Sequence, residues 1–442
     1  MKTCLVFRRF VSHRFIHSVG RWIVPLGLVY DAASAPIQPV DLAYLATLRA
    51  EVRAAHPGVA GAQARAAAAE ATVRAVRRWD DPTAGVAGRL ASSERRGGEG
   101  EFAFSGEQGL PQPGLYAARR HEAKAGVAMA MAEIGTAALA AEVRVIKTTV
   151  ALALTDESMA LGAQQLAWLV QQESVTRVSL GDPQSTAVPL LRMGAELARD
   201  RQRLASLTPQ RLGLVGQLNT LLGRPLGAEW PELALPDQVT EPTANELIEL
   251  LARLPLANPR LLALKGSSAA ALAGVEVAQR VRQPRFALTA ETWTIGEQRH
   301  VDTVLGARMS LPWGQRAVYR AQVDRARELA RGVALDFQSL ERDLRGEVVA
   351  IHAAVSVAAQ KSLNLRAGVI PRLAEASKAL DNAWLSSRVS LLEILEARRA
   401  LLAALLDQRS AVADYASAQE SLRALVPPLN ANLVPLRPPP SP

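Results

Sequence analysis

The clearest pattern in the chain is a coiled-coil spacing of small and apolar residues in its second half. These residues follow one another at alternating intervals of four and three: Ala326, Ala330, Val333, Phe337, Leu340 and Leu344. Such spacing predicts helices that pack along a common seam. The seam lies in a run from Gln315 to about Ile370, and a similar run extends from Leu115 to about Thr176. At ~1.5 Å per residue, each helix would be roughly 80–90 Å long, far longer than globular helices.

A different pattern, with period two, precedes each long helix. Between positions 301 and 310, Val301, Thr303, Leu305, Ala307 and Met309 face one way, and Asp302, Gly306, Arg308 and Ser310 face the other. The earlier segment alternates less regularly, through Ala84, Val86, Leu90, Phe102 and Phe104. Alternation of this kind predicts strands. We expect one β-hairpin at 83–107 and one at 285–310. Each strand has the ~10 residues that a tilted strand needs to cross a bilayer.

Proline and glycine punctuation shows that the two halves are a tandem repeat. His56-Pro57 corresponds to Asn258-Pro259, and in both copies the next marker, Pro82 or Pro284, stands 26 residues after the His or Asn. The two junctions Leu110-Pro111-Gln112-Pro113-Gly114 and Leu311-Pro312-Trp313-Gly314 also correspond. Because these residues restrict or free the backbone, equal spacing implies equal elements between them.

The chain therefore divides into five parts. We expect a signal peptide at 1–35, a first repeat at 36–223, an inter-repeat connector at 224–257, a second repeat at 258–426 and a disordered Pro-rich tail at 427–442. The signal rests on a basic start, the apolar run Trp22 to Tyr30 and the small residues Ala33-Ser34-Ala35. No later run approaches the ~20 apolar residues of a membrane helix.

Composition excludes several classes of protein. Of the net charge of +9, residues 1–35 carry +4, and the rest is expected to be spread without a basic stripe, which disfavours nucleic-acid binding. Cys4 is the only cysteine, so disulfides and cysteine-based metal sites are excluded. The six histidines do not cluster, and no nucleophile, phosphate-loop or metalloprotease motif occurs. We expect no metal site, no cofactor and no enzymatic activity.

Four amphipathic strands cannot close a barrel by themselves. Open sheet edges are not tolerated in lipid, so membrane crossing would require strands from several chains. The alternative is a pair of ordinary hairpins on a soluble helical protein.

At this point the chain resembles the TolC-like outer-membrane efflux family over about residues 40–426. The resemblance rests on the two repeated sets of junctions, on Trp79-Asp80-Asp81-Pro82 and Gln283-Pro284, and on Ser390 to Arg399 after the second helical turn. It implies a mainly α fold with a small β part: tandem helical hairpins form a trimeric α-helical barrel, and four strands per chain join a shared 12-stranded transmembrane β-barrel. The junction sequence LPQPGLYAARR and the short connector look closest to the heavy-metal cation branch.

The resemblance also implies a cellular location and partner proteins. The chain would be the exit duct of a tripartite efflux system in the cell outer membrane, with a long periplasmic tunnel. It would form a homotrimer and contact outer-membrane lipid, a periplasmic adaptor and an inner-membrane transporter of the RND type. Multidrug efflux or type I secretion by the same fold is an alternative. A soluble periplasmic coiled-coil scaffold or adaptor is a second alternative, from another class.

Two groups of residues are matched to functional positions of the family. Leu392, Glu393, Glu396 and Arg399 match a periplasmic gate, where carboxylates of three chains would surround the pore and favour cations. The alternative is a solvated helix face on which Glu396 and Arg399 pair. The adaptor-docking tips would be Arg177, Val178, Ser179, Leu180 and Gly181 in the first repeat and Leu385, Ser386, Ser387, Arg388 and Val389 in the second. The alternative for each tip is a plain turn between helices.

Overall fold

The computed structural model describes residues 37–90, 100–179, 188–295, 300–385 and 389–428. The expected signal peptide, most of the expected tail and five tip residues (Leu180, Gly181, Ser386, Ser387 and Arg388) lie outside these ranges. Residues 37–442 form one unit, which is described by itself.

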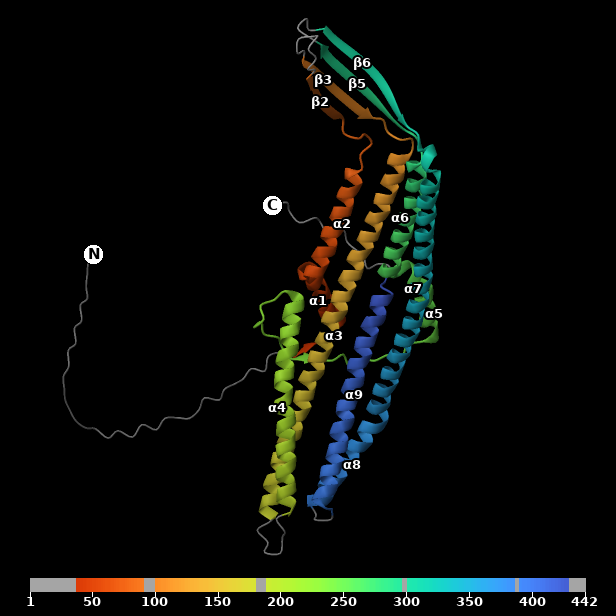
Figure 1. Cartoon of the computed structure of the whole chain (residues 1–442). Coiled ribbons are helices and arrows are strands. Elements are labelled where there is room, and N and C mark those ends of the chain that lie inside the picture. The colour runs from red at the N-terminus through yellow and green to blue at the C-terminus, as the bar shows by residue number, and fades with distance from the viewer. Residues whose placement is uncertain (1–36, 91–99, 180–187, 296–299, 386–388, 429–442) are drawn as a thin grey trace, which may run out of the picture. The chain divides into compact units, whose positions relative to one another are not determined.

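The two repeats contain the same order of elements (Figure 1). The first consists of α1 (Leu42–Ala55), α2 (Pro57–Ala75), β2 (Thr83–Leu90), β3 (Gly100–Gly109), α3 (Leu115–Ser179) and α4 (Val188–Leu222). The second consists of α6 (Pro259–Val281), β5 (Arg285–Ile295), β6 (His300–Ser310), a short 3-10 turn (Pro312–Gln315), α7 (Arg316–Asn364), a π-helical turn (Leu365–Val369), α8 (Ile370–Leu385) and α9 (Leu391–Leu425), and α5 (Ala244–Ala257) precedes it at the end of the expected connector.

The residues that revealed the repeat are helix caps. The side chain of His56 accepts a hydrogen bond from Gly58 N (3.1 Å), and that of Asn258 accepts from Arg260 N (2.9 Å). Each cap is followed by proline at the first helical position, where a missing N–H costs nothing. The helices that end at these caps, α1 and α5, both have 14 residues. The helix α5, at the end of the expected connector, therefore corresponds to α1 of the first repeat.

The second long helix extends further than its sequence pattern indicates. We expected it to end near Ile370, but α8 continues it to Leu385 through the π-helical turn. Pro371 lies just after that turn, and its ring would clash with the carbonyl four residues earlier in a regular helix. A wider turn relieves this clash, so the proline does not end the helix.

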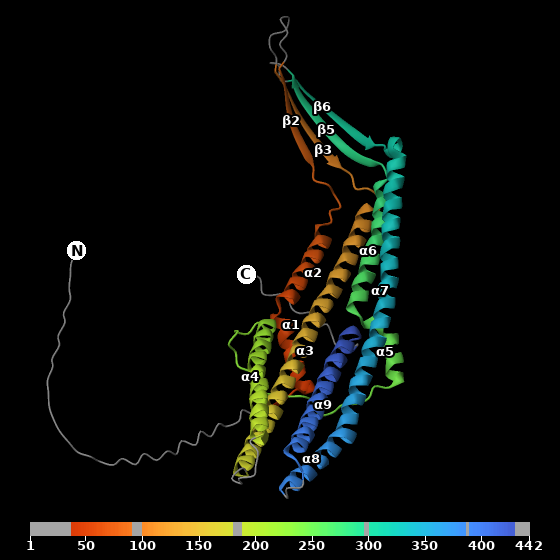
Figure 2. The same ribbon diagram turned by 60° about the horizontal axis from the view of Figure 1, so that its bottom comes forward.

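The helices lie side by side, and the four strands continue from one end of them (Figures 1 and 2). The main apolar core lies where α1, α3, α4 and α9 meet the connector. Its fully buried members include Leu48, Val52, Leu152, Leu218 and Leu233. In the connector, β4 (Leu233–Ala234) pairs in parallel with β1 (Gln38–Pro39).

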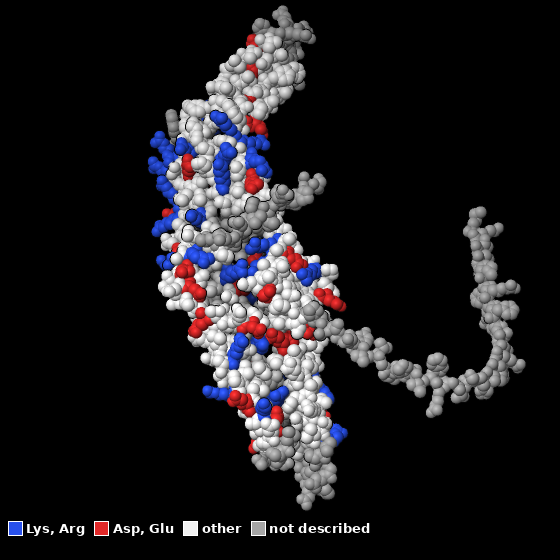
Figure 3. Space-filling view, turned by 180° about the vertical axis from the view of Figure 1, so that it is seen from behind, with Lys and Arg blue, Asp and Glu red and all other residues white. Residues whose placement is uncertain are grey.

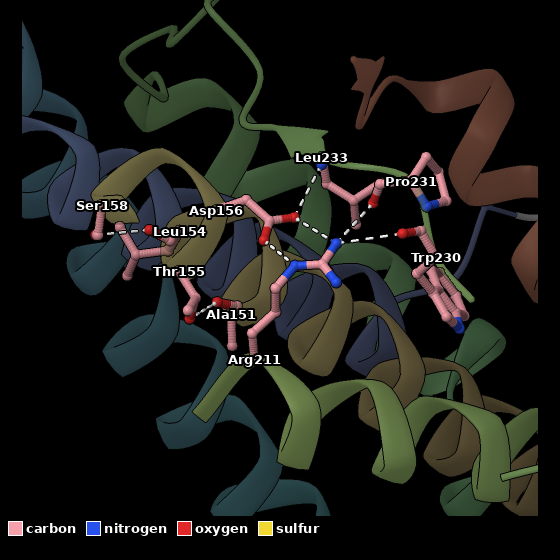
Figure 4. A network of polar contacts seen from close by, with 9 residues as sticks. All are labelled: Ala151, Leu154, Thr155, Asp156, Ser158, Arg211, Trp230, Pro231 and Leu233. Atoms are coloured by element: carbon pink, nitrogen blue, oxygen red, sulfur yellow. Dashed lines mark hydrogen bonds and ion pairs between the residues drawn. The ribbon is translucent and has the colours of Figure 1, made fainter. Parts of the chain in front are cut away.

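A polar network fixes the connector against α3 and α4 (Figure 4). Arg211 on α4 donates from Nε to Asp156 Oδ1 on α3 (2.6 Å) and from Nη2 to the carbonyl of Trp230 (3.2 Å). Asp156 Oδ2 in turn accepts from Leu233 N (3.0 Å). The network satisfies connector backbone groups that would otherwise be buried without partners.

By length and composition alone, two helical stretches of the described chain could cross a membrane: Ala244–Val281 and Arg316–Trp384. By this measure our expectation of no such run does not hold. Ala244–Val281 is interrupted at Asn258, whose backbone is extended. One or two such stretches are weak evidence for membrane helices.

Candidate functional site

The four long strands form one antiparallel sheet in the order β2-β3-β5-β6. Each expected hairpin is present, and β3 pairs with β5 to join them. One row of residues crosses all four strands: Val86, Phe104, Thr292 and Thr303 are successive partners. Within the described residues, β2 and β6 each pair on one side only, so both outer edges of the sheet are open.

The register gives the sheet two chemically different faces. The face that contains Val86 and Leu305 carries no charged residue in the described strands, and its apolar side chains are exposed: Val86 72%, Phe102 55%, Phe104 54%, Leu288 53%, Val301 56% and Leu305 80%. The opposite face carries Glu107, Arg285, Glu291, Asp302 and Arg308. An exposed apolar face of this extent needs an apolar environment or a partner to cover it.

An ion pair marks the charged face. Arg308 Nη1 on β6 lies 2.7 Å from Glu107 Oε2 on β3, across the intervening strand β5. The residue of β5 opposite Glu107 is Thr289, whose side chain is small. The two side chains therefore meet over β5, on the charged face of the sheet.

The two hairpins are fixed to the helices through one junction. Leu110 N donates to the carbonyl of Phe286 (2.7 Å), and Gln112 Nε2 donates to that of Gln283 (2.7 Å). Gly114 has φ of +75°, and a Cβ placed on it would meet the guanidinium of Arg280 at 3.1 Å. Glycine is favoured here because the left-handed backbone strains other residues, and an added Cβ would also require Arg280 to shift.

The predicted gate residues lie on the first turns of α9, and the structure gives two of them local partners. Ser390 caps α9 by accepting from Glu393 N (3.4 Å), while Glu393 Oε2 accepts from Ser390 N (3.1 Å). This reciprocal pair is a capping box. Arg399 forms a two-point ion pair with Glu196 on α4. The alternative pairing with Glu396 is therefore not the one observed.

Leu392, Glu393 and Glu396 are exposed, whereas Ile394 and Leu395 on the same turns are buried. The three exposed residues thus share a surface that α4 and α8 do not cover. Glu196 could not be predicted from the sequence, because nothing in its surroundings indicates which helix it contacts. The gate role itself stays a prediction.

Two carboxyl groups near the start of α9, those of Asp200 and Asp381, have raised pKa values. Burial raises the pKa of Asp200 on α4, and the neighbouring Glu196 raises it further. Burial also raises the pKa of Asp381 on α8, while the nearby Arg398 opposes that effect. Arg398 stacks over the ring of Trp168 at 5.2 Å, so α9 also contacts α3 here.

The described tip residues continue their helices. Arg177, Val178 and Ser179 form the last turn of α3, and Leu385 ends α8. Arg177 pairs with Glu173 one turn earlier (2.8 Å). Val389 lies just before the cap of α9. Within the described ranges, no group of three or more His, Cys, Asp or Glu residues could hold a metal ion.

The basic residues are not spread evenly, which corrects our expectation. The helical segments next to the sheet (57–82, 115–135, 259–285 and 311–336) contain 17 Lys and Arg against nine Asp and Glu, a net charge of +8. On the face drawn in Figure 3, Lys and Arg side chains gather over the helices nearest the sheet. This excess of basic residues could not be predicted from the sequence, because the residues come from four separate segments. Only the fold brings these segments together beside the sheet.

No family model matches the chain, and no curated protein does. Solved structures do match it. The outer membrane protein VceC from Vibrio cholerae superposes with a TM-score of 0.71 at 16% identity, covering 87% of this chain and 96% of VceC. The outer-membrane channel OprN gives 0.73 at 17% identity, covering 86% and 89%. CusC, whose structures concern folding and transmembrane channel formation, gives 0.74 at 14% identity, covering 86% and 91%.

The chain therefore has the TolC-like fold of these outer-membrane proteins. Its mainly helical architecture, with long helices and four antiparallel strands, confirms the predicted fold class. At these levels of identity the match concerns the fold alone.

Proposed function

We propose that the chain is an outer-membrane channel, the exit duct of a tripartite efflux system. The observation that carries this proposal is the open-edged sheet with one uncharged, exposed face and one charged face. In lipid, every strand edge must be paired, so the sheet would close only with sheets of further copies. The uncharged face would meet lipid, and the charged face would line water.

Three copies would give a shared 12-stranded barrel, and the long helices would continue it as a tunnel through the periplasm. This arrangement agrees with the folds of VceC, OprN and CusC, which their descriptions place in the outer membrane or in a transmembrane channel. A periplasmic adaptor would dock at the two helical tips, and an RND-type pump would supply the cargo.

The cargo is proposed to include heavy-metal cations. The junction Leu110 to Arg120 supports this choice, since its sequence looks closest to the metal branch. The structural likeness extends about equally to CusC and to OprN, and so does not distinguish between cargo classes. A passive duct has no need of a metal-binding cluster, because transport selectivity would reside in the pump.

The gate would lie at the start of α9. Leu392, Glu393 and Glu396 are exposed there, and three copies around one axis would place their carboxylates close together. Like charges repel at short range, so such a ring would be easy to open and would favour cations. The ion pair between Arg399 and Glu196 would hold α9 against α4 within one chain.

Cell fractionation with chemical cross-linking tests the proposal. We expect the full chain in the outer-membrane fraction, as a cross-linked trimer that withstands mild detergent. A chain recovered as a monomer in the soluble periplasmic fraction would instead support a coiled-coil scaffold or adaptor.

A further inference from the structure

Every junction between a strand and a helix carries exposed arginines. Arg77 and Arg78 lie between α2 and β2, Arg119 and Arg120 lie in the second turn of α3, Arg282 lies between α6 and β5, and Arg316 and Arg320 lie in the first two turns of α7. All seven lie within about three helical turns' length of chain from a strand end, at ~3.6 residues per turn. We call this set the junction arginines.

Most junction arginines have no acidic partner. Among the ion pairs of the described residues, only Arg77 has one, with Asp81. The other six guanidinium groups are exposed, and like charges gathered at one level favour the binding of an external anion. Charge elsewhere on the helices is more often paired: Arg49, Arg53, Arg211, Arg224, Arg399 and Arg409 all contact carboxylates.

Apolar side chains lie at the same level as the junction arginines. Trp79 follows Arg78 directly and is 51% exposed, Phe286 follows Arg285 and is 46% exposed, and Leu311 is 44% exposed. Tryptophan beside arginine is typical of the boundary between lipid tails and headgroups, where the ring and the arginine stem lie in the apolar layer and the charge reaches the phosphates. An aqueous conduit gives no reason for exposed apolar groups beside the charges.

We infer that the junction arginines form a belt that binds anionic phospholipid headgroups of the inner leaflet of the membrane. The inference rests on the proposed function, because it takes the uncharged sheet face to lie in lipid. Guanidinium groups donate two parallel hydrogen bonds to phosphate oxygens, and basic residues at a membrane surface favour anionic lipids about fivefold each at low salt. The belt would fix the depth of the chain in the membrane.

The test counts phosphatidylglycerol and phosphatidylcholine bound to the full-length protein by native mass spectrometry. The protein is equilibrated with mixed micelles of both lipids at low and at high salt. One variant set replaces one unpaired arginine per junction: Arg78→Gln, Arg120→Gln, Arg282→Gln and Arg316→Gln. A matched set replaces exposed arginines away from the sheet that form no ion pair within the described residues: Arg144→Gln, Arg201→Gln, Arg342→Gln and Arg372→Gln. A third set places lysine at the four junction positions.

The wild type, the distant set and the lysine set should prefer phosphatidylglycerol, with the preference weakened by salt. The junction glutamine set should lose that preference at least tenfold. An unchanged preference in the junction glutamine set overturns the inference. So does a junction set that keeps its lipids and instead changes the ion selectivity of the channel, since the arginines would then face the pore. Failure of all four proteins to reach the outer-membrane fraction would count against the proposed function itself.

Discussion

Arg49 on α1 and Glu420 on α9 form a buried ion pair, with Nη2 and Oε2 2.6 Å apart, although 371 residues separate them. Less than a tenth of either side chain is exposed. Glu142 on α3 lies 4.0 Å from the Nε of Arg49 and also pairs with Arg53. The pair thus ties the first helix of the chain to the last one at the level of the main core.

Replacing Glu420 by alanine should destabilise the protein strongly. The change leaves the buried Arg49 guanidinium with only Glu142, which lies 4.0 Å away and is shared with Arg53, and loss of one partner of a buried pair costs about 3–5 kcal/mol. Glu341→Ala is the matched control, because its pair with Arg345 lies at the surface. The control should change the free energy of unfolding by less than about 1 kcal/mol. Thermal or denaturant unfolding measures the change in the free energy of unfolding for both variants. Equal changes would show that the buried ion pair contributes no more to stability than the surface pair.

Gly266 on α6 should not tolerate alanine. A Cβ at this position would lie 2.8 Å from the backbone nitrogen of Met129 on α3 and 2.9 Å from its Cα. Neither backbone atom can move without separating the helices, so Gly266→Ala should cost about 1–3 kcal/mol. Gly126→Ala, on α3 with open space around it, should be neutral or stabilise by up to about 1 kcal/mol. If both variants unfold at the same temperature, the helices do not approach as closely as the structure shows.

Glu157 should make stability depend on pH. Burial raises the pKa of this carboxyl, against the opposing effects of the hydrogen bond from Leu235 N and of Arg409. A carboxyl with a raised pKa in the folded state binds protons more tightly there than in the unfolded chain. Its contribution therefore becomes more favourable as the pH falls from above the folded-state pKa toward the unfolded value of 4.5.

The variant Glu157→Gln isolates this contribution, because the amide oxygen still accepts from Leu235 N but cannot titrate. The difference in melting temperature, wild type minus variant, should shift in favour of the wild type as the pH falls from 7 to about 4.5. A difference that is constant with pH, or that shifts in the other direction, would contradict the raised pKa.

Removal of the gate carboxylates should raise single-channel conductance. Glu393→Ala combined with Glu396→Ala removes the charges that are proposed to surround the closed pore. Glu393 also belongs to the capping box, so the double variant could act by loosening α9. Ser390→Ala is the control, since it breaks the cap and keeps both carboxylates. Planar-bilayer recordings decide: conductance unchanged in the double variant, or raised equally in the control, would exclude a gating role.

The sequence predicted the repeat and the hairpins because their signals are local. Proline and glycine spacing, and alternation along Val301 to Met309, act within one or two elements. The pairing of β3 with β5 and the ion pairs Arg49–Glu420 and Arg399–Glu196 could not be predicted, since each joins residues about 200 or more positions apart. The junction arginines were missed for the same reason. Each group is unremarkable in sequence, and only the fold places all four groups beside the sheet.

The boundary at Ile370 illustrates a different limit. A proline normally ends a helix, so Pro371 favoured a break. The π-helical turn before it removes the steric conflict, and packing of the flanking helices against α9 stabilises the continuous helix. Local propensity was outweighed by tertiary contacts at this point.

The most direct test of the account compares two neighbouring residues of β6. Leu305 lies on the uncharged face and Val304 on the charged face, and both are exposed. Leu305→Cys and Val304→Cys, each in a background with Cys4→Ser, are labelled with a fluorophore and reconstituted as full-length protein in vesicles. The channel account predicts that brominated lipid quenches the label at 305 and aqueous iodide quenches the label at 304. Equal quenching of both labels by iodide, with none by brominated lipid, would show that the sheet does not cross a membrane.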